Sequence, residues 1–391
     1  MRIAFYAPLK APSHAVPSGD RRVGRLLVDA LRVGGHQVDL VSELRTYDRG
    51  GDASRQVRLR DESRLVADGL IRKWEGSGRA AAPDLWFTYH VYYKAPDWVG
   101  PMVSRVLGIP YAIAEASYAP KRENGAWALG HSGAREAIHA ASLILCPIRD
   151  DMACIETEAR PGARVELLPP FLDPAPYRAA LMDRNARRDA LRGAHGLDDS
   201  VPWIVVAAMM RPGDKAASYR MLAENLKRIE DLPWKLVVAG DGLARDEIVG
   251  AIDTAVPGRA CYLGECDSEL LASVYAAGDL CVWPAVNEAY GMAMLEAQAA
   301  GLPVISRRIR GVQDVVLDGV TGLLAPPDEE GKIASFTREL LCDPTRRRSM
   351  GEAAARFVAA ERSVEVAATR LNRALEGLSG NVTQSPGLQR R

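Results

Sequence analysis

The stretch PAVNEAYGMAMLEAQAAGLPVIS (residues 284–306) combines the end of an apolar strand, a short loop, a helix and the entry to another strand. The loop carries Glu288, Gly291 begins the helix, and Gly301 and Pro303 end it. A helix that starts directly after a strand of a parallel sheet presents backbone N–H groups that an anion can bind. The stretch therefore predicts a parallel α/β sheet with an anion site at its edge.

The same stretch places two carboxylates beside this anion site. Glu288 and Glu296 have seven residues between them, and Glu296 is flanked by Leu295 and Ala297. Carboxylates repel a phosphate, so we expect these two to accept hydrogen bonds from sugar hydroxyls. The alternative for Glu296 is a solvated position on the helix surface, which its apolar neighbours disfavour.

Working outward, the chain alternates short apolar strands with amphipathic helices on both sides of a proline- and arginine-rich stretch. Strands are predicted at 2–7, 37–42, 85–90, 111–114, 143–146, 165–168, 204–209, 235–239, 260–263, 280–283 and 304–306. Helices are predicted at 21–33, 218–230, 243–255, 268–277 and 291–300. This alternation predicts an α/β protein with two doubly wound parallel sheets, whose ligand site lies in a cleft between them.

The expected domain boundaries follow from changes in composition. We expect a first domain over 1–170, a linker with one helix over 171–200, and a second domain over 201–360. A helix over 361–379 follows, and then a polar tail over 380–391 that we expect to be disordered.

Composition excludes several classes of protein. The 391 residues include 50 Lys and Arg and 50 Asp and Glu, so bulk positive charge does not favour a nucleic-acid partner. No apolar run reaches the length of about 20 residues that a membrane-spanning helix needs. Neither the six cysteines nor the histidines form a metal-ligand spacing, and no Asp-x-Asp motif occurs, so we expect reduced thiols and no metal. No G-x-G-x-x-G follows a predicted strand, which argues against a dinucleotide oxidoreductase.

At this point the sequence resembles a known family. The spacing of Pro284, Glu288, Gly291, Glu296 and Pro303 resembles the E-x7-E signature of retaining glycosyltransferases of family 4, which have the GT-B fold. Further matching segments are Arg211 with Lys215, VAGDG (238–242), LG (263–264), YAAGD (275–279) and TGLL (321–324). The resemblance implies two Rossmann-like domains facing a cleft and a C-terminal helix that returns to the first domain.

The resemblance also implies roles for these residues toward a nucleotide-diphosphate sugar. Arg211 and Lys215 would neutralise the diphosphate, Glu296 would bind the ribose hydroxyls, and Glu288 would hold the transferred sugar. The implied donor-binding set is Gly19, Arg211, Lys215, Gly240, Tyr290, Gly291, Met292 and Glu296. The implied catalytic set is Glu288, His90, Arg211 and Lys215, with no metal and no resident cofactor.

The resemblance is looser in the first half of the chain, and two interpretations stay open there. His90 ends a predicted strand and either lies near the reacting carbon of the sugar or is a satisfied edge residue beside the aromatic run 89–93. Glu115 ends another strand and is a candidate for the acceptor side. Ser18-Gly19-Asp20 lacks the family's paired glycines, and Ala289 replaces a glycine beside the sugar, so the donor sugar is left open.

The expected function is transfer of a hexose from a UDP- or GDP-sugar to a glycan or glycolipid acceptor in envelope glycan synthesis. The rivals are an inactive sugar-nucleotide-binding protein and a sugar-nucleotide epimerase of the same fold. We expect a cytoplasmic location. For the arginine-rich segment 45–79 the alternatives are a solvated face and contact with the inner surface of an anionic membrane.

Overall fold

The computed structural model describes residues 1–16, 18–76, 78 and 81–378. The chain forms two compact units: one comprises Met1–Pro169 with Val364–Arg391, and the other comprises Pro170–Ser363. We call them unit 1 and unit 2. The tail expected at 380–391 lies outside the described residues.

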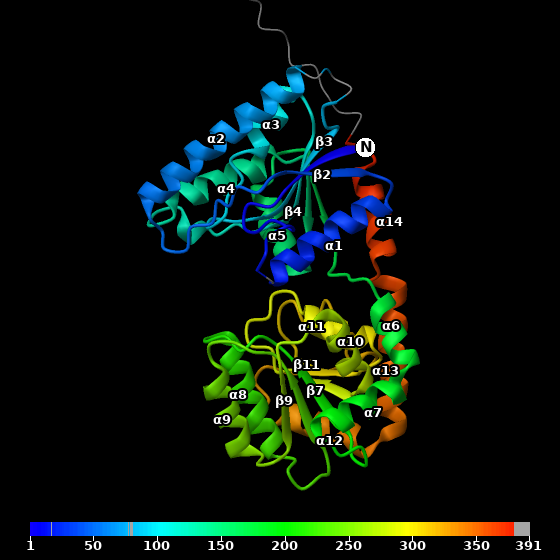
Figure 1. The fold of residues 1–391 in the computed structure, drawn as a ribbon. Coiled ribbons are helices and arrows are strands. Elements are labelled where there is room, and N and C mark those ends of the chain that lie inside the picture. The colour runs from blue at the N-terminus through cyan, green and yellow to red at the C-terminus, as the bar shows by residue number, and fades with distance from the viewer. Residues whose placement is uncertain (17, 77, 79–80, 379–391) are drawn as a thin grey trace, which may run out of the picture. The chain divides into compact units, whose positions relative to one another are not determined.

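Unit 1 is built on a six-stranded sheet in which all strand pairs are parallel (Figure 1). Its spatial order is β2 (Gln37–Ser42), β1 (Arg2–Tyr6), β3 (Leu85–Val91), β4 (Tyr111–Ala116), β5 (Leu143–Cys146) and β6 (Arg164–Leu167). The central strands are buried along almost their whole length, because helices cover both faces of the sheet. This matches the near-continuous apolar runs from which these strands were predicted.

Helices of unit 1 form two layers on its sheet. One layer contains α2 (Ala53–Gly76), α3 (Gly100–Leu107), α4 (Ala128–Ala140) and α5 (Arg149–Glu158), which pack successively on one another. Their core with the sheet includes Trp74, Trp86 and Tyr111. A short 3-10 helix, η1 (Pro120–Arg122), precedes α4. The other layer contains α1 (Gly19–Val33) and α14 (Val364–Leu375).

The last helix of the chain joins unit 1, as the resemblance implied. Both ends of the Asn372 side-chain amide, on α14, form hydrogen bonds within unit 1. Asn372 Oδ1 lies 2.8 Å from His36 Nε2, and Asn372 Nδ2 donates to the Gly34 carbonyl at 3.0 Å. His36 is therefore a structural residue that ties α14 to the loop after α1.

Unit 2 contains a second six-stranded sheet, also parallel throughout its pairs. Its order is β12 (Gly322–Ala325), β11 (Val304–Arg307), β10 (Leu280–Val282), β7 (Trp203–Ala207), β8 (Lys235–Ala239) and β9 (Ala260–Gly264). The four-residue strand β12 was not among the predicted strands.

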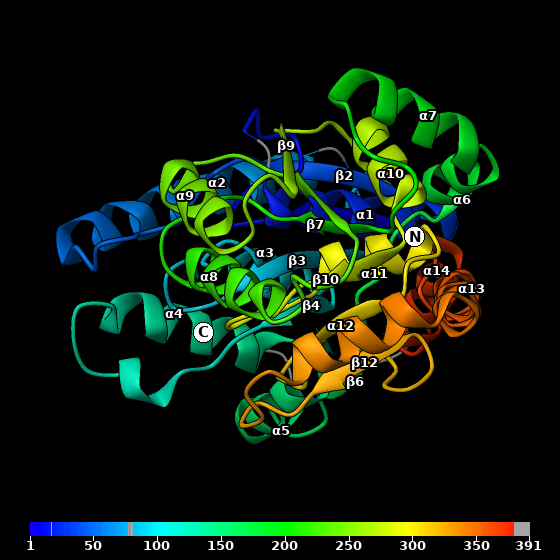
Figure 2. The same cartoon turned by 90° about the horizontal axis from the view of Figure 1, so that it is seen from below.

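Helices also cover the sheet of unit 2 (Figures 1 and 2). One group comprises α8 (Asp214–Lys227), α9 (Arg245–Ala255) and α12 (Lys332–Cys342), with α8 contacting both others. A second comprises α10 (Ser268–Ala277), α11 (Met292–Ala299) and α13 (Pro344–Glu361), with α11 contacting both others.

The stretch expected to be a linker, 171–200, is instead part of unit 2. It forms two helices, α6 (Ala175–Met182) and α7 (Arg184–His195), where one helix was predicted. Both pack on α10, and Arg184 and Arg188 each form an ion pair with Asp279, at 2.9 and 3.0 Å. The arginines that suggested a solvated linker are used in this packing.

Each sheet contains one place where the strand order reverses. In unit 1 this switch point lies between β1 and β3, and in unit 2 it lies between β7 and β10. The connections leave the two central strands toward opposite edges, so their carboxyl ends are not covered by a crossing helix. In open α/β sheets this is where ligands bind.

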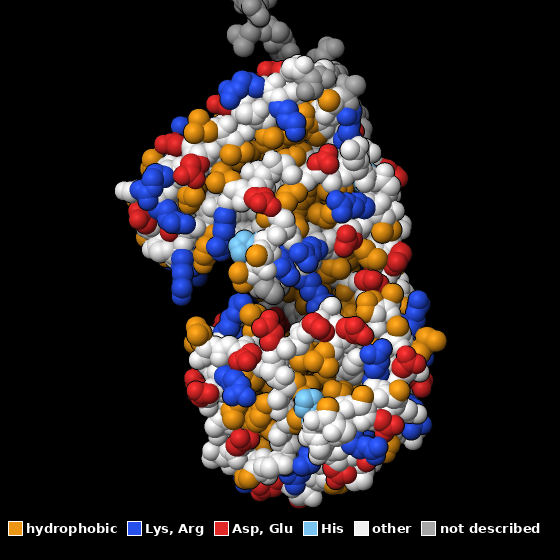
Figure 3. Space-filling model, viewed as in Figure 1, with side chains coloured by type: hydrophobic (Ala, Val, Ile, Leu, Met, Phe, Trp, Pro, Cys, Tyr) orange, Lys and Arg blue, Asp and Glu red, His pale blue; other side chains and the backbone are white. Residues whose placement is uncertain are grey.

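Other sequence expectations concern the surface and the thiols. Within the described residues, no helix has both the length and the apolar character to cross a bilayer. All six cysteines are free thiols. On the face seen in Figure 3, cationic and anionic side chains are interspersed.

Candidate active site

The loops after β7 and β10 meet at the switch point of unit 2. The Val286 N–H donates to Ser218 Oγ at 2.9 Å, and Asn287 Nδ2 lies 3.4 Å from Asp214 Oδ1. Both partners lie on α8, so the loop after β10 is held against the first turns of the helix that follows β7. This contact brings the predicted cations and Glu288 together.

Lys215, in the first turn of α8, forms an ion pair with Glu288 in the loop after β10. Lys215 Nζ donates to Glu288 Oε2 at 2.6 Å and lies 5.4 Å from the centre of the Trp283 ring. The two charged side chains are 34% and 17% exposed, so the pair is partly shielded from water. A charge-assisted bond of this kind fixes both groups at the edge of the sheet.

Arg211 lies in the same region but has a different environment. It is exposed, and its guanidinium has no hydrogen-bond or ion-pair partner within the described part of the chain. Its loop is anchored by the backbone: the Met210 N–H donates to the Asp241 carbonyl, and the Ala244 N–H donates to the Met210 carbonyl. The loop is thus fixed while the cationic group stays available.

Gly240 contributes to this anchoring by its missing side chain. Its φ is +151°, and an added Cβ would lie 2.0 Å from the Ala208 carbonyl oxygen. Gly240 therefore permits the loops after β7 and β8 to approach each other closely. This is a structural role, and it differs from the predicted direct contact with the nucleotide sugar.

The loop 283–291 is held in an unusual backbone conformation. Ala285 and Asn287 have φ values of +54° and +51°, which cost about 1–3 kcal/mol each for residues other than glycine. Gly291 caps α11 at φ +69°, and an added Cβ on Gly311 would lie 2.8 Å from the Glu288 carbonyl oxygen. Such strain persists where the surrounding structure fixes the chain.

The residues that follow Glu288 lead into α11. Tyr290 is half-buried, Gly291 is the N-cap residue, and Met292 is the first residue of the helix. The first N–H groups of a helix have no acceptor within the helix, so Met292 offers a donor at this edge.

Glu296 lies on the buried side of α11. It is 4% exposed, which rules out the alternative of a solvated helix position. Burial raises the pKa of the neighbouring Cys281 thiol to about 12, and the negative charge of Glu296 adds to this effect.

A second cluster lies at the switch point of unit 1. Asp20 in the first turn of α1 places Oδ1 3.2 Å from His90 Nδ1, and Glu115 Oε1 lies 3.5 Å from the same nitrogen. Gly19 precedes Asp20, and an added Cβ there would meet no atom within 4 Å. Both carboxylates face Nδ1, and His90 Nε2 has no partner within the described residues.

The backbone at this cluster is also strained. His90 and Glu115 both have φ values of +64°. They are neighbours across β3 and β4, because the flanking residues Tyr89 and Val91 pair with Ala114 and Ala116. The matched kinks turn the imidazole and the carboxylate toward each other.

The three groups shift one another's pKa values. Burial lowers the pKa of His90, but the charge of Glu115 and the hydrogen bond to Asp20 outweigh it, so the pKa is raised. Burial raises the pKa of Asp20, but the hydrogen bond and charge of His90 leave it lowered. Burial raises the pKa of Glu115 despite the opposing charge of His90. Because the pKa of His90 is raised on folding, its contribution to stability is complete below about pH 6.5 and is lost as pH rises through the folded value.

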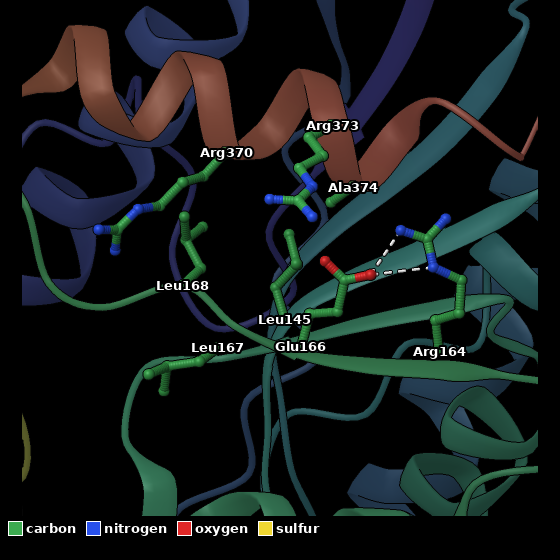
Figure 4. A pocket seen from close by; sticks show the side chains of 8 residues that line it. All are labelled: Leu145, Arg164, Glu166, Leu167, Leu168, Arg370, Arg373 and Ala374. Carbon is green, nitrogen blue, oxygen red and sulfur yellow. Dashed lines mark hydrogen bonds and ion pairs between the residues drawn. The ribbon is translucent and has the colours of Figure 1, made fainter.

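The cavity in Figure 4 lies elsewhere in unit 1, between β6 and α14. It has a volume of about 390 Å³ and is lined by Arg164, Arg370 and Arg373, with Glu166 bonded to Arg164. None of the residues predicted for catalysis or donor binding lines it. Among the described residues, no group of three or more His, Cys, Asp and Glu could hold a metal ion.

Comparisons with known proteins agree with this architecture. Sucrose-phosphate synthase from Thermosynechococcus elongatus has a TM-score of 0.69 and 18% identity, with 96% of this chain and 98% of that chain covered. Anabaena HepE in complex with UDP has a TM-score of 0.71 and 15% identity, with 96% and 100% covered. The fold is therefore GT-B.

The sequence comparisons point to one class of enzyme. Residues 202–343 match the family model of glycosyl transferases group 1. Alpha-D-kanosaminyltransferase of Streptomyces kanamyceticus is 29% identical over 287 residues, 69% of this chain and 71% of the relative. D-inositol 3-phosphate glycosyltransferase of Nocardia farcinica is 33% identical over 196 residues, but the match spans 42% of that relative. Residues 202–343, which lie in unit 2, therefore resemble glycosyl transferases group 1, and the chain has the GT-B fold.

Sequence reasoning missed one member of the unit 1 cluster. Asp20 was noted as a departure from the paired glycines but was given no role toward His90. The available signal was its position in the first turn of a helix that follows a central strand, next to Gly19.

The cluster predicts how His90 titrates. We expect its pKa, measured by NMR titration of the ring protons, to lie above its usual value of about 6.5. Asp20→Asn should lower it, because a hydrogen-bonded carboxylate charge is removed. Asp29→Asn removes an equal charge from the exposed side of α1 and should leave it unchanged. A wild-type pKa at or below 6.5 would contradict the geometry.

Proposed function

We propose that the protein transfers a hexose, with retention of configuration, from a UDP- or GDP-sugar to an acceptor hydroxyl. The observation that carries this proposal is the gathering of Arg211, Lys215 and Glu288 at the switch point of unit 2, beside the N-termini of α8 and α11. A similar structure, Anabaena HepE, was solved with UDP and with UDP-glucose, which supports a nucleotide-sugar donor.

The diphosphate is the part of the donor that this edge suits best. Arg211 offers a permanently charged, bidentate contact, and Lys215 adds a second charge in the first turn of α8. The N–H groups at the start of two helices add partial positive charge. In the proposal, Arg211 binds the diphosphate directly because it has no protein partner to leave.

Lys215 has such a partner, and this gives donor binding a specific consequence. Its 2.6 Å bond to Glu288 must loosen when the ammonium turns to a phosphate oxygen. Glu288 is then released to accept hydrogen bonds from hydroxyls of the transferred sugar. The apo ion pair therefore keeps both groups ordered, and the donor replaces it with two separate charge-assisted contacts.

The reaction step in the proposal needs no base supplied by the protein. The acceptor oxygen forms a bond to the anomeric carbon on the face from which the diphosphate leaves. The bond between the anomeric carbon and the phosphate oxygen breaks, and its electron pair goes to the phosphate. The acceptor proton passes to that phosphate. The protein's contribution is to position the reactants and stabilise the departing charge, without a metal ion.

The acceptor in this proposal is a glycan or glycolipid of the cell envelope, and the protein works in the cytoplasm. The arginine-rich helix α2 exposes several cations together with Val57 and Leu65, 40% and 71% exposed. In the proposal, these cations and apolar side chains contact an anionic membrane surface.

The rival functions make different predictions at the same residues. An inactive sugar-nucleotide-binding protein would bind donor without releasing nucleotide diphosphate, and an epimerase would alter the sugar and transfer none. The retained Arg211, Lys215 and Glu288 favour transfer over both.

The two cations give the first test of the donor site. Arg211→Ala and Lys215→Ala should each weaken binding of UDP or GDP by about 10- to 150-fold, the range for one charge-assisted hydrogen bond. Arg211→Ala should have the larger effect, because Lys215 must first leave Glu288. Lys227→Ala, an exposed cation in the last turn of α8, is the matched control in calorimetric titrations. Wild-type affinity in either variant would disprove its proposed role.

The two glutamates separate ribose binding from sugar binding. Glu296→Gln should weaken the binding of bare nucleotide diphosphate and the binding of sugar nucleotide by similar factors of about 10 or more. Glu288→Gln should leave bare nucleotide affinity unchanged or slightly tighter, since it loosens Lys215, while turnover falls at least tenfold. Titration calorimetry and steady-state rates measure both. The opposite pattern would exchange the two assignments.

The stereochemical outcome tests retention. When the donor is α-linked, proton NMR of the transfer product should show an α-linkage. Proton NMR of the slow hydrolysis of the same donor should show that the sugar released first is the α anomer. A chelator should leave the initial rate unchanged. An initial β product would overturn retention, and a rate abolished by chelation and restored by a divalent cation would overturn metal independence.

A further inference from the structure

Unit 1 contains a second polar surface that the donor site does not use. Three aromatic side chains form a continuous path that starts at His90. The ring centre of Tyr92 lies 5.0 Å from that of His90, and the ring centre of Tyr93 lies 5.5 Å from that of Tyr92. The ring centre of Trp127 lies 5.7 Å from that of Tyr93. We call Tyr92, Tyr93 and Trp127 the aromatic platform. All three are half-buried, so each ring keeps some accessible surface.

Two cations lie over the far end of this platform. Lys94 Nζ is 5.7 Å from the Tyr93 centroid and 5.0 Å from that of Trp127. The Arg122 guanidinium carbon is 5.4 Å and 5.3 Å from the same two rings. Cation–π contacts hold such groups near aromatic rings, and they are stronger with partial desolvation.

Neither cation is neutralised by the protein. Within the described residues, Lys94 and Arg122 have no carboxylate at ion-pair distance, and the buried Arg122 Nε has no hydrogen-bond partner. The nearby buried carboxylate of Asp48 is occupied by the Asp52 N–H and the Gln56 amide. Two like charges over the same pair of rings repel each other, and an anion bound beside them would remove that cost.

The surface is also fixed in place. Trp127 Nε1 donates to the Asp48 carbonyl at 3.1 Å, and the Asp48 N–H donates to the Lys94 carbonyl at 2.8 Å. Three segments distant in sequence are thereby joined around the rings. A preorganised site of this kind loses little conformational entropy when it binds a ligand.

We propose that the aromatic platform with Lys94 and Arg122 is the acceptor subsite, and that the acceptor is a sugar bearing an anionic group, either a phosphate or a carboxylate. This inference rests on the proposed function. The sugar ring would stack its C–H face on the aromatic rings, and the anion would contact the two cations. The hydroxyl that receives the hexose would then point along the platform toward His90.

The test uses glucose 6-phosphate, glucuronate and glucose as probes of the full-length protein, titrated calorimetrically at saturating UDP. Bound UDP covers Arg211 and Lys215, so the titration reports binding of the anionic sugar at another site. The wild-type protein should bind at least one anionic sugar tenfold or more tighter than glucose, and comparing the two separates phosphate from carboxylate recognition. Lys94→Met and Arg122→Met should each reduce that preference at least fivefold.

Lys121→Met is the matched control, because Lys121 is an exposed cation in η1 next to Arg122. It should keep the preference, and UDP affinity should be unchanged in all three variants. The His90 ring protons should titrate in each variant as in the wild type, which shows that unit 1 is folded. Equal binding of charged and neutral sugars, or a preference that survives both variants, would overturn the subsite.

A further arm separates this inference from the proposed function. If the preference for the anionic sugar disappears in Arg211→Ala, the anion was binding at the donor site and the subsite is wrong. Failure of the wild-type protein to bind UDP or GDP would instead overturn the proposed function. In that case the sugar titrations without nucleotide still decide whether Lys94 and Arg122 select an anion.

Discussion

The reversal of strand order in each parallel sheet is the constraint on which the candidate site depends. At the reversal between β7 and β10, connections leave in opposite directions, so two loops and two helix N-termini meet without a helix crossing above them. The 2.6 Å bond between Lys215 and Glu288 is formed across this point. In unit 1, the reversal between β1 and β3 brings Asp20 at the start of α1 to His90.

Backbone strain is concentrated at the same edges. His90, Glu115, Ala285 and Asn287 are the non-glycine residues with positive φ within the described chain, and all four follow or end central strands at their carboxyl ends. Beside the strained loop of unit 2, Gly311 approaches so closely that an added side chain would collide with the carbonyl oxygens of Glu288 and Ala289. Strain held in this way keeps charged side chains oriented before a ligand arrives, which reduces the cost of binding it.

Local sequence patterns predicted most of this architecture, and long-range contacts account for what they missed. Apolar runs, glycines and prolines located the strands of both sheets and the start of α11, because these signals act within a few residues. β12 was not predicted as a strand, although its TGLL segment was noted, and the arginines of α7 resembled a linker because their partner, Asp279, is about 90 residues away. The convergence of Asp20 on His90, and of Lys94 with Arg122 on shared rings, depends on strand register and loop packing that no local pattern encodes.

The central claim is that the switch point of unit 2 binds the donor diphosphate through Arg211 and Lys215, releasing Glu288 for the sugar. A crystal structure of the protein with a nucleotide-diphosphate sugar tests it most directly. The account predicts phosphate oxygens within hydrogen-bond distance of both cations, the bond between Lys215 and Glu288 broken, and a sugar hydroxyl on Glu288. A diphosphate bound away from the loops after β7 and β10, or an intact ion pair in the complex, would contradict it.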